Sequence, residues 1–406
     1  MTQVNNYRWV IVAAGGLLGC IAIGAMFALP VLLVPMSQAT GWSRTGISSA
    51  MTIGFLATAV GSMGWGALSD RFGPRIVALC GSLLLAIGIA LAGLAQSLIQ
   101  FQLVFGLVVG LAVAAIFAPM MAAVTGWFDT HRSLAVSLVS AGMGMAPMTM
   151  APFAAWLITR YDWRTSLLII AGIVLAVMIP TALLLRRPPA LDRQHDAAGS
   201  ANEPSDMTVG EAIRSPQFIV LMLTNFACCA THSGPIFHTV SYAIACGIPA
   251  IAAVSIYSVE GLAGMGGRIV FGVLGDRLGA KRVLVAGLFV QAIGAALYFF
   301  VRELSEFYAV ATLFGFTYAG VMPLYAVIIR ENFPMRMLGT IIGGTGMAGS
   351  LGMALGPFAG GWIYDTYASY GWLYLGSFGL GLGATLIAAT FRPFAKPQPA
   401  PIGLPA

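Results

Sequence analysis

Two charged side chains lie inside a long apolar segment. Residues 250–273 form an apolar run of helical length that holds Glu260 and Arg268. An arginine at the centre of a membrane-spanning helix costs about 2.5–3.5 kcal/mol, so it is expected to face a watery cavity. Its planar guanidinium suits bidentate binding of a carboxylate. A buried carboxyl group can take up and release a proton. The two residues therefore predict anion and proton chemistry, unless Arg268 reaches the membrane surface and Glu260 only hydrogen-bonds a neighbouring helix.

The spacing of these two residues argues against a direct ion pair. Eight residues of regular helix separate them by about 12 Å and by a rotation of about 80°. Other polar residues of the apolar segments could join a cavity for a small organic acid: His232, His238, Asn225, Tyr257, Tyr318 and Tyr325. The histidines are also candidates for proton transfer. A hydrogen bond between helices is an equal alternative for His232, and packing is an alternative for each tyrosine.

The composition indicates which elements must carry these residues. Of 406 residues, 59% are hydrophobic and 8% are charged, and the mean hydropathy is +0.89. This excludes an ordinary water-soluble protein. Helix-length runs without the alternation of a membrane barrel predict an all-α membrane protein with twelve spans. The predicted spans are 9–35, 46–68, 76–96, 100–124, 134–158, 165–185, 216–244, 250–273, 282–301, 304–329, 338–363 and 371–391.

The basic residues predict the orientation in the membrane. With the N-terminus inside the cell, 15 of the 20 lysines and arginines are cytoplasmic, four are outside and Arg268 lies within a span. The positive-inside rule therefore places both termini in the cytoplasm. These charges flank helices and are not interleaved with aromatic residues, so nucleic acid is not an expected partner. The expected location is the inner membrane of a bacterial-type cell, with many passes through the lipid bilayer.

The chain divides into two similar halves. A polar linker, 186–215, separates a predicted bundle at 1–185 from a second at 216–391, and a tail at 392–406 follows. The segment GALSDRFGPR at 66–75 recurs as GVLGDRLGAK at 272–281. Because each half has an even number of helices, the repeat is parallel, with a pseudo-two-fold axis along the membrane normal.

This repeated loop resembles the loop motif of the major facilitator superfamily. The resemblance covers nearly the whole chain and implies two six-helix bundles that alternate between outward-open and inward-open states. It also implies that both copies of the loop gate the cytoplasmic side, unless the loop only aids topology. The gating candidates are Gly66, Asp70, Arg71 and Gly73, with Gly272, Asp276, Arg277 and Gly279 in the second copy. The aspartates are expected to engage helix ends and arginines of the opposite half.

Two features resemble the monocarboxylate transporter and oxalate:formate antiporter branch of that superfamily. They are the stretch from Trp127 to Gly142, and Arg268, eight residues before the loop aspartate. In that branch this arginine binds the substrate carboxylate. Animal monocarboxylate transporters have an aspartate one turn earlier, where this chain has Gly264. The lysine that the oxalate antiporters carry between 339 and 362 is also absent, and a single cation favours a monoanion over a dicarboxylate.

We therefore expect a secondary active transporter of a small monocarboxylate, similar to lactate or pyruvate, with proton symport by Glu260, His232 or His238. It is expected to act as a monomer, without metal or cofactor. One alternative is an exporter of hydrophobic drugs, suggested by six methionines between 120 and 150, and another is an organic anion antiporter. A transport-incompetent sensor is less favoured. An enzyme is not expected, because the sequence has no catalytic triad, metal-ligand cluster or phosphate loop.

Overall fold

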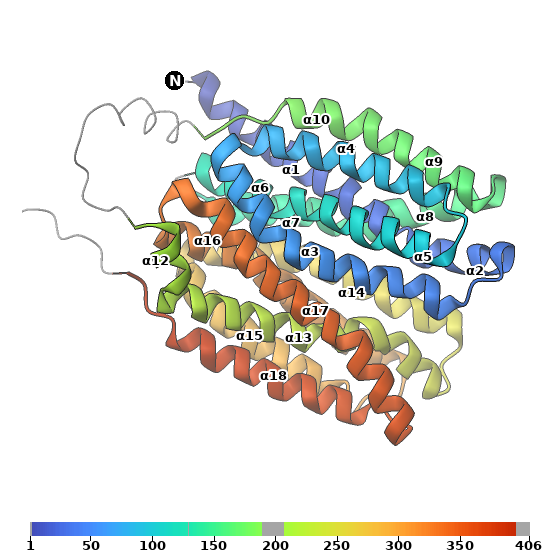
Figure 1. Ribbon diagram of the computed structural model, residues 1–406. Helices are drawn as coiled ribbons and strands as arrows, with labels where there is room; N and C mark the ends of the chain where they lie inside the picture. Colours follow the sequence, from blue (N-terminus) through green and yellow to red (C-terminus); the bar gives the residue numbers. More distant parts are fainter. Residues whose placement is uncertain (1, 129, 189–206, 395–406) are drawn as a thin grey trace, which may run out of the picture.

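The computed structural model describes residues 2–128, 130–188 and 207–394, and the regular structure within them is entirely helical (Figure 1). The helices of the first half are α1 Thr2–Met26, α2 Leu29–Thr40, α3 Arg44–Phe72, α4 Pro74–Gly93, α5 Leu98–Phe101, η1 Gln102–Val109, α6 Gly110–Trp127, α7 Arg132–Gly144, α8 Ala146–Arg160, α9 Trp163–Ile173, η2 Val174–Met178 and α10 Ile179–Leu183. Those after it are α12 Val209–Arg214, α13 Pro216–Ala245, α14 Ala250–Leu278, α15 Ala280–Leu297, α16 Leu304–Asn332, η3 Met335–Met337, α17 Leu338–Tyr367 and α18 Gly371–Thr390.

Helices lie over all twelve predicted segments, with two interruptions. The predicted span 9–35 is divided between α1 and α2, and 134–158 is divided between α7 and α8. A proline occupies the first turn of both α2 and α8. Proline has no N–H to donate, so it fits the start of a new helix better than the interior of an old one.

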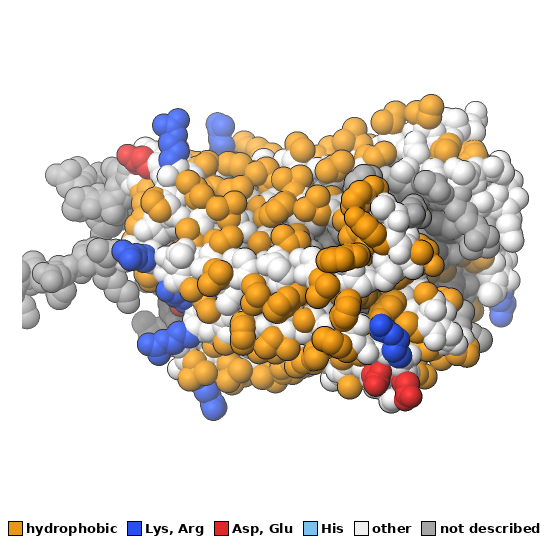
Figure 2. Space-filling view, turned by 90° about the horizontal axis from the view of Figure 1, so that it is seen from below, with side chains coloured by type: hydrophobic (Ala, Val, Ile, Leu, Met, Phe, Trp, Pro, Cys, Tyr) orange, Lys and Arg blue, Asp and Glu red, His pale blue; other side chains and the backbone are white. Residues whose placement is uncertain are grey.

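Ten of the described helical stretches are long and apolar enough to cross a membrane. The ten do not include α7 with α8 or α14, which carries Glu260, Arg268, Asp276 and Arg277. The number twelve therefore stays a prediction, as do the orientation and the bundle boundaries. Figure 2 shows hydrophobic side chains over the middle of one face, with the Lys and Arg side chains near its two ends. This distribution fits a multi-pass membrane protein.

The predicted linker begins and ends at one end of the molecule, which we call the linker end (Figure 1). Its residues 189–206 lie outside the described part of the chain, as do residues 395–406 of the predicted tail. Within the predicted linker, α12 begins with a capping box in which Thr208 and Glu211 exchange hydrogen bonds. Those bonds hold the pKa of the Glu211 carboxyl below its usual value.

Figure 1 shows the first half, α1 to α10, on one side and α13 to α18 on the other, with α3 and α17 side by side between them. These two helices touch through glycines: a β-carbon on Gly66 would lie 1.9 Å from the Gly339 carbonyl oxygen. At the second copy of the motif, α14 packs against α7, and a β-carbon on Gly272 would lie 2.5 Å from Ser137 Oγ. Glycine is needed at both positions because backbone or side-chain atoms of the opposite half occupy the space.

A Gly66→Ala substitution should therefore destabilise the protein. The added methyl group has no room against the α17 backbone, and overpacking of this kind costs about 1–3 kcal/mol. We expect a lower midpoint of thermal unfolding in detergent. Gly64 on the same helix is the matched control, because no atom of the described residues lies within 4 Å of the place that its new methyl group would take. Gly64→Ala should leave the midpoint unchanged or raise it, and equal midpoints for the two variants would contradict this packing argument.

Candidate functional site

Asp70 connects the two halves at the linker end. Its Oδ1 accepts a hydrogen bond from the Gly339 N–H at 2.7 Å, and its Oδ2 accepts bonds from the Thr340 N–H at 2.7 Å and Oγ1 at 2.6 Å. The carboxylate thus lies at the N-terminus of α17, where unpaired N–H groups and the helix dipole favour a negative charge. We call this contact the first seam.

Asp276 makes the equivalent contact in the second copy of the motif. Its two carboxylate oxygens accept hydrogen bonds from the Ser133 N–H at 2.9 Å and the Leu134 N–H at 3.1 Å. These groups belong to the first turn of α7, so we call this contact the second seam. Each aspartate therefore lies at the start of a helix in the opposite half. The turns that follow are made by Gly73 and Gly279, whose φ values of 87° and 90° favour glycine.

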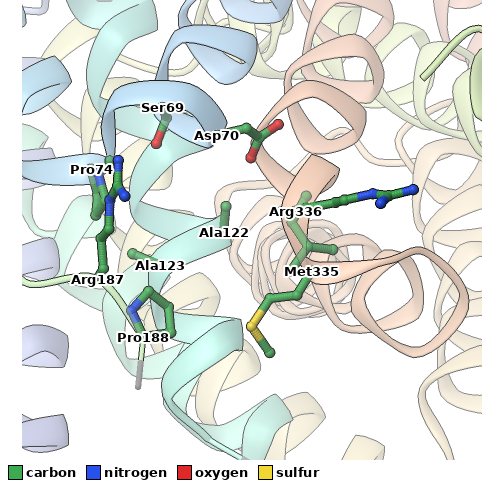
Figure 3. Close-up of a pocket in the computed structure, with 11 residues that line it drawn as sticks. Ser69, Asp70, Pro74, Ala122, Ala123, Arg187, Pro188, Met335 and Arg336 are labelled. Atoms are coloured by element: carbon green, nitrogen blue, oxygen red, sulfur yellow. The ribbon is translucent and has the colours of Figure 1, made fainter. Parts of the chain in front are cut away.

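Several arginines lie near the two seams, and their expected contacts with the seam aspartates stay a prediction. Figure 3 shows Asp70 directed to the start of α17, while the Arg187 side chain lies beside Pro74 and Arg336 extends away. Arg187 donates a hydrogen bond to the Arg71 carbonyl oxygen at 2.9 Å, and the Arg71 guanidinium lies over the Phe72 ring. Arg277 lines a cavity of about 600 Å³ beside the second seam. Backbone N–H groups donate hydrogen bonds to both aspartates, and the Thr340 hydroxyl donates a further one to Asp70.

Arg268 extends from α14 to α7 of the opposite half. Its Nε donates a hydrogen bond to Ser140 Oγ at 3.1 Å. Its guanidinium lies on Gly144, where a β-carbon would come too close to Nη1. Neither contact residue was predicted, because serine and glycine are common throughout these helices and nothing in the pattern distinguishes these two. The cation predicted to bind a carboxylate therefore lies at the interface between the two halves.

A small cavity adjoins this contact. Ser140, Asn225 and Tyr325 are among its lining residues, and its volume is about 40 Å³. This is room for a few water molecules and is far below the roughly 300–1,000 Å³ of typical ligand pockets. The Asn225 amide donates a hydrogen bond to the Thr345 carbonyl oxygen at 2.8 Å, and Tyr325 is buried. The described residues therefore leave only a small space at this point of the interface.

Glu260 lies inside the second half. It is only 1% exposed, and its Oε1 has no hydrogen-bond partner among the described residues. It packs against α16, where a β-carbon on Gly315 would be 2.8 Å from Glu260 Cγ. One of the two sequence interpretations of Glu260 was a hydrogen bond to a neighbouring helix. Its Oε1 makes no such bond to the described residues. A buried carboxylate oxygen without a hydrogen-bond partner is costly in such surroundings when the group is ionised.

The two histidines of α13 have different surroundings. His232 is buried, its Nδ1 lies 3.3 Å from Gln291 Nε2, and its ring stacks on Tyr318 with 4.9 Å between centroids. It therefore has the hydrogen bond between helices that was one of its two interpretations. Gln291 was missed, although it is a lone amide in the apolar segment 282–301. His238 packs against Gly360 of α17 and against the Tyr370 ring.

Gly264 lies on α14, one turn before Arg268. A β-carbon there would be 3.0 Å from Ala319 Cβ and 3.2 Å from the Gly315 carbonyl oxygen, so α14 and α16 would have to shift slightly to take a larger side chain. Tyr257, also on α14, is 37% exposed.

Comparisons with known proteins agree with this architecture. The family model described as Major Facilitator Superfamily matches residues 15–301 and 267–404. Monocarboxylate transporter 13 of Bos taurus is 27% identical over 403 residues, which is 98% of this chain and 93% of that protein. The sialic acid transporter NanX of Escherichia coli (strain K12) is 26% identical, covering 84% of this chain and 80% of that protein.

Solved structures show the same fold at low sequence identity. The transporter FucP in the outward conformation has a TM-score of 0.74 at 15% identity, covering 95% of this chain and 99% of that one. The proton:xylose symporter XylE has a TM-score of 0.73 at 15% identity, covering 96% of each chain. The prediction of a transporter rather than an enzyme is confirmed. The chain belongs to the Major Facilitator Superfamily.

Proposed function

We propose that this transporter carries a small monocarboxylate, similar to lactate or pyruvate, together with a proton. The observation that carries the proposal is the position of Arg268, a guanidinium at the interface between the halves that donates a hydrogen bond to a neutral serine. A fixed cation beside a neutral partner there favours an anionic substrate. The names of relatives, a monocarboxylate transporter and a sialic acid transporter, support an acid as the substrate.

Alternating access follows from the two seams. We infer that the linker end is cytoplasmic and that this conformation is closed there by the hydrogen bonds of Asp70 and Asp276. Opening to the cytoplasm would break both contacts, after which the aspartates and the helix N-termini would be hydrated. The halves 1–185 and 216–391 would move as two bodies around Arg268. We expect a monomer in the inner membrane of a bacterial-type cell, with twelve spans and both termini in the cytoplasm.

An exporter of hydrophobic solutes is the less supported alternative. Of the six methionines that suggest it, Met120, Met121, Met143 and Met150 are buried. A β-carbon on Gly19 would be 2.3 Å from Met143 Cγ, and one on Gly24 would be 2.2 Å from Met150 Cγ. The Met143 and Met150 side chains therefore fill gaps beside α1, a packing role that suits the flexible methionine side chain. An organic anion antiporter would use the same cation, but it would exchange one anion for another and would not need a proton.

Arg268→Lys should reduce lactate uptake into proteoliposomes by about 10- to 100-fold, because lysine cannot form two parallel hydrogen bonds to a carboxylate and loses about 1.5–3 kcal/mol. Arg164→Lys is the matched control, since Arg164 donates to the Gly93 carbonyl oxygen at the end of α4. That control should transport at the wild-type rate. Unchanged uptake by Arg268→Lys would remove this residue from the site.

Gly144→Ala tests the place of the guanidinium. The new methyl group would occupy the position of Arg268 Nη1, so the arginine must move and lose its alignment with the substrate. We expect the KM for lactate to rise by about tenfold or more, the effect of losing about 1.4 kcal/mol. Gly172→Ala is the control, because its new methyl group would have no atom of the described residues within 4 Å. If both variants keep the wild-type KM, Arg268 does not bind substrate where we place it.

A substrate panel separates the candidate functions. Labelled lactate and pyruvate should exchange in counterflow, and unlabelled monocarboxylates should raise the unfolding temperature of the purified protein by mass action. Lipophilic cations should do neither. Stabilisation by the cations alone would instead favour the exporter. Counterflow with a dicarboxylate, together with uptake that ignores a pH gradient, would favour the anion antiporter.

A further inference from the structure

The segment that follows α10 lies across the linker end of the first half. The Tyr7 hydroxyl donates a hydrogen bond to the Leu184 carbonyl oxygen at 2.7 Å, and the Tyr7 ring centroid lies 4.1 Å from the Arg186 guanidinium. The Trp127 indole N–H donates a hydrogen bond to the Arg186 carbonyl oxygen at 3.2 Å. These contacts hold the start of the predicted linker against α1 and α6, so this segment does more than join the two halves.

The next two residues of the linker fill space beside the first seam. A β-carbon on Gly73 would lie 2.6 Å from Arg187 Nε. A β-carbon on Gly126 would lie 2.7 Å from Pro188 Cγ and 3.7 Å from Met335 Sδ, which belongs to η3 of the second half. Figure 3 shows Arg187, Pro188 and Met335 around the pocket that remains, whose volume is about 40 Å³.

Both described ends of the predicted linker lie against η3. At one end, Pro188 lies beside Met335. At the other end, the Arg336 guanidinium donates a hydrogen bond to the Met207 carbonyl oxygen at 2.8 Å. Helix α17 begins directly after η3, and its first turn donates the hydrogen bonds to Asp70. The linker therefore holds the turn that positions the donors of the first seam.

The second copy of the motif lacks this filling among the described residues. The repeat that aligns Gly73 with Gly279 also aligns Arg187 with Pro393, which has no long side chain to extend. No atom of the described residues lies within 4 Å of the place that a β-carbon on Gly279 would take. The cavity there has a volume of about 600 Å³, and all three residues of the second seam line it.

Water therefore reaches the two seams to different extents. Asp276 is exposed, whereas Asp70 is half-buried. The hydrogen bonds of Asp276 measure 2.9 and 3.1 Å, and the three of Asp70 measure 2.6 to 2.7 Å. A hydrogen bond that water can replace adds little stability. The second seam is the one that water can replace more readily.

We propose that the two seams open in a fixed order, the second before the first, and that Arg187 and Pro188 set this order as positioning residues. This inference rests on the alternating access of the proposed function. Water in the large cavity replaces the α7 N–H groups at Asp276 while the first seam stays closed. The first seam opens only after the linker segment has moved away from Gly73 and η3. The path to the linker end therefore begins to open between α7 and α14.

Hydrogen–deuterium exchange of the purified wild-type protein in nanodiscs tests this order, because the seam donors are themselves backbone N–H groups. Ser133 and Leu134 are the second and third residues of α7, and Gly339 and Thr340 are the second and third residues of α17. N–H groups at these positions have no partner within their own helix, so their exchange reports the opening of each seam. After correction for intrinsic exchange rates, we expect protection to be about tenfold or more higher at the first seam.

Arg187→Ala removes the filling and leaves the covalent linker intact. The variant loses the guanidinium beside Gly73 and its hydrogen bond to the Arg71 carbonyl oxygen, so protection at the first seam should fall about tenfold. Protection at the second seam should stay as in wild type. Arg214→Ala is the matched control, because Arg214 is an exposed arginine at the other end of the predicted linker. That control should exchange as wild type at both seams.

Equal protection at the two seams of the wild-type protein, or higher protection at the second, would overturn the inference. Unchanged protection at the first seam of Arg187→Ala would also overturn it, as would an equal fall at both seams, which a general loss of stability would cause. If Arg187→Ala does not fold, the wild-type comparison decides. Lactate counterflow is measured on the same preparation. Its absence would contradict the proposed function, whereas equal protection with normal counterflow would contradict only the order of the seams.

Discussion

The cost of holding a charge away from water is the constraint on which this structure depends. Four charged residues of the described helices show how this cost is reduced: Asp70, Asp276, Arg268 and Glu260. Asp70 and Asp276 lie at helix N-termini, where backbone N–H groups complete their hydrogen bonds. Arg268 lies at the interface between the halves, with Ser140 as a partner. Glu260 differs from these three residues, because its buried Oε1 has no hydrogen bond to the described part of the chain.

The carboxylate contacts of the two seams are easier to break than a buried ion pair would be. An ion pair buried between the halves would lose several kcal/mol per charge if the partners separated without water. A carboxylate at a helix N-terminus gains about 0.3–1 kcal/mol from the dipole, and both groups are readily hydrated after separation. The halves can therefore be held closed by many small contacts, glycine packing included, without a single bond that dominates the barrier.

Periodicity and charge were enough to predict the helices and to single out Arg268 and Glu260 as charges within a span, because hydropathy and rare charges are properties of the chain itself. The breaks at α1–α2 and α7–α8 were not predicted, although Pro30 and Pro147 are their local signals. The helix ends contacted by the two aspartates were expected, but the partners of Arg268 and His232 could not be predicted. Ser140, Gly144 and Gln291 matter because of which helix faces which, and that is decided by packing between segments far apart in sequence.

Helix α7 has a mechanical consequence for the transport cycle. Its first turn is attached to α14 by Asp276, and its last turns are attached to α14 by Arg268, through Ser140 and Gly144. The 13 residues of α7 form a rod about 20 Å long, which ends where the chain is interrupted before α8. Because α7 contacts α14 near both of its ends, it cannot tilt relative to α14 while both contacts hold. In the proposed cycle, an anion that binds Arg268 would separate it from Ser140 and leave the Asp276 contact in place. Helix α7 could then pivot about Asp276, so substrate binding itself would permit the movement of the halves.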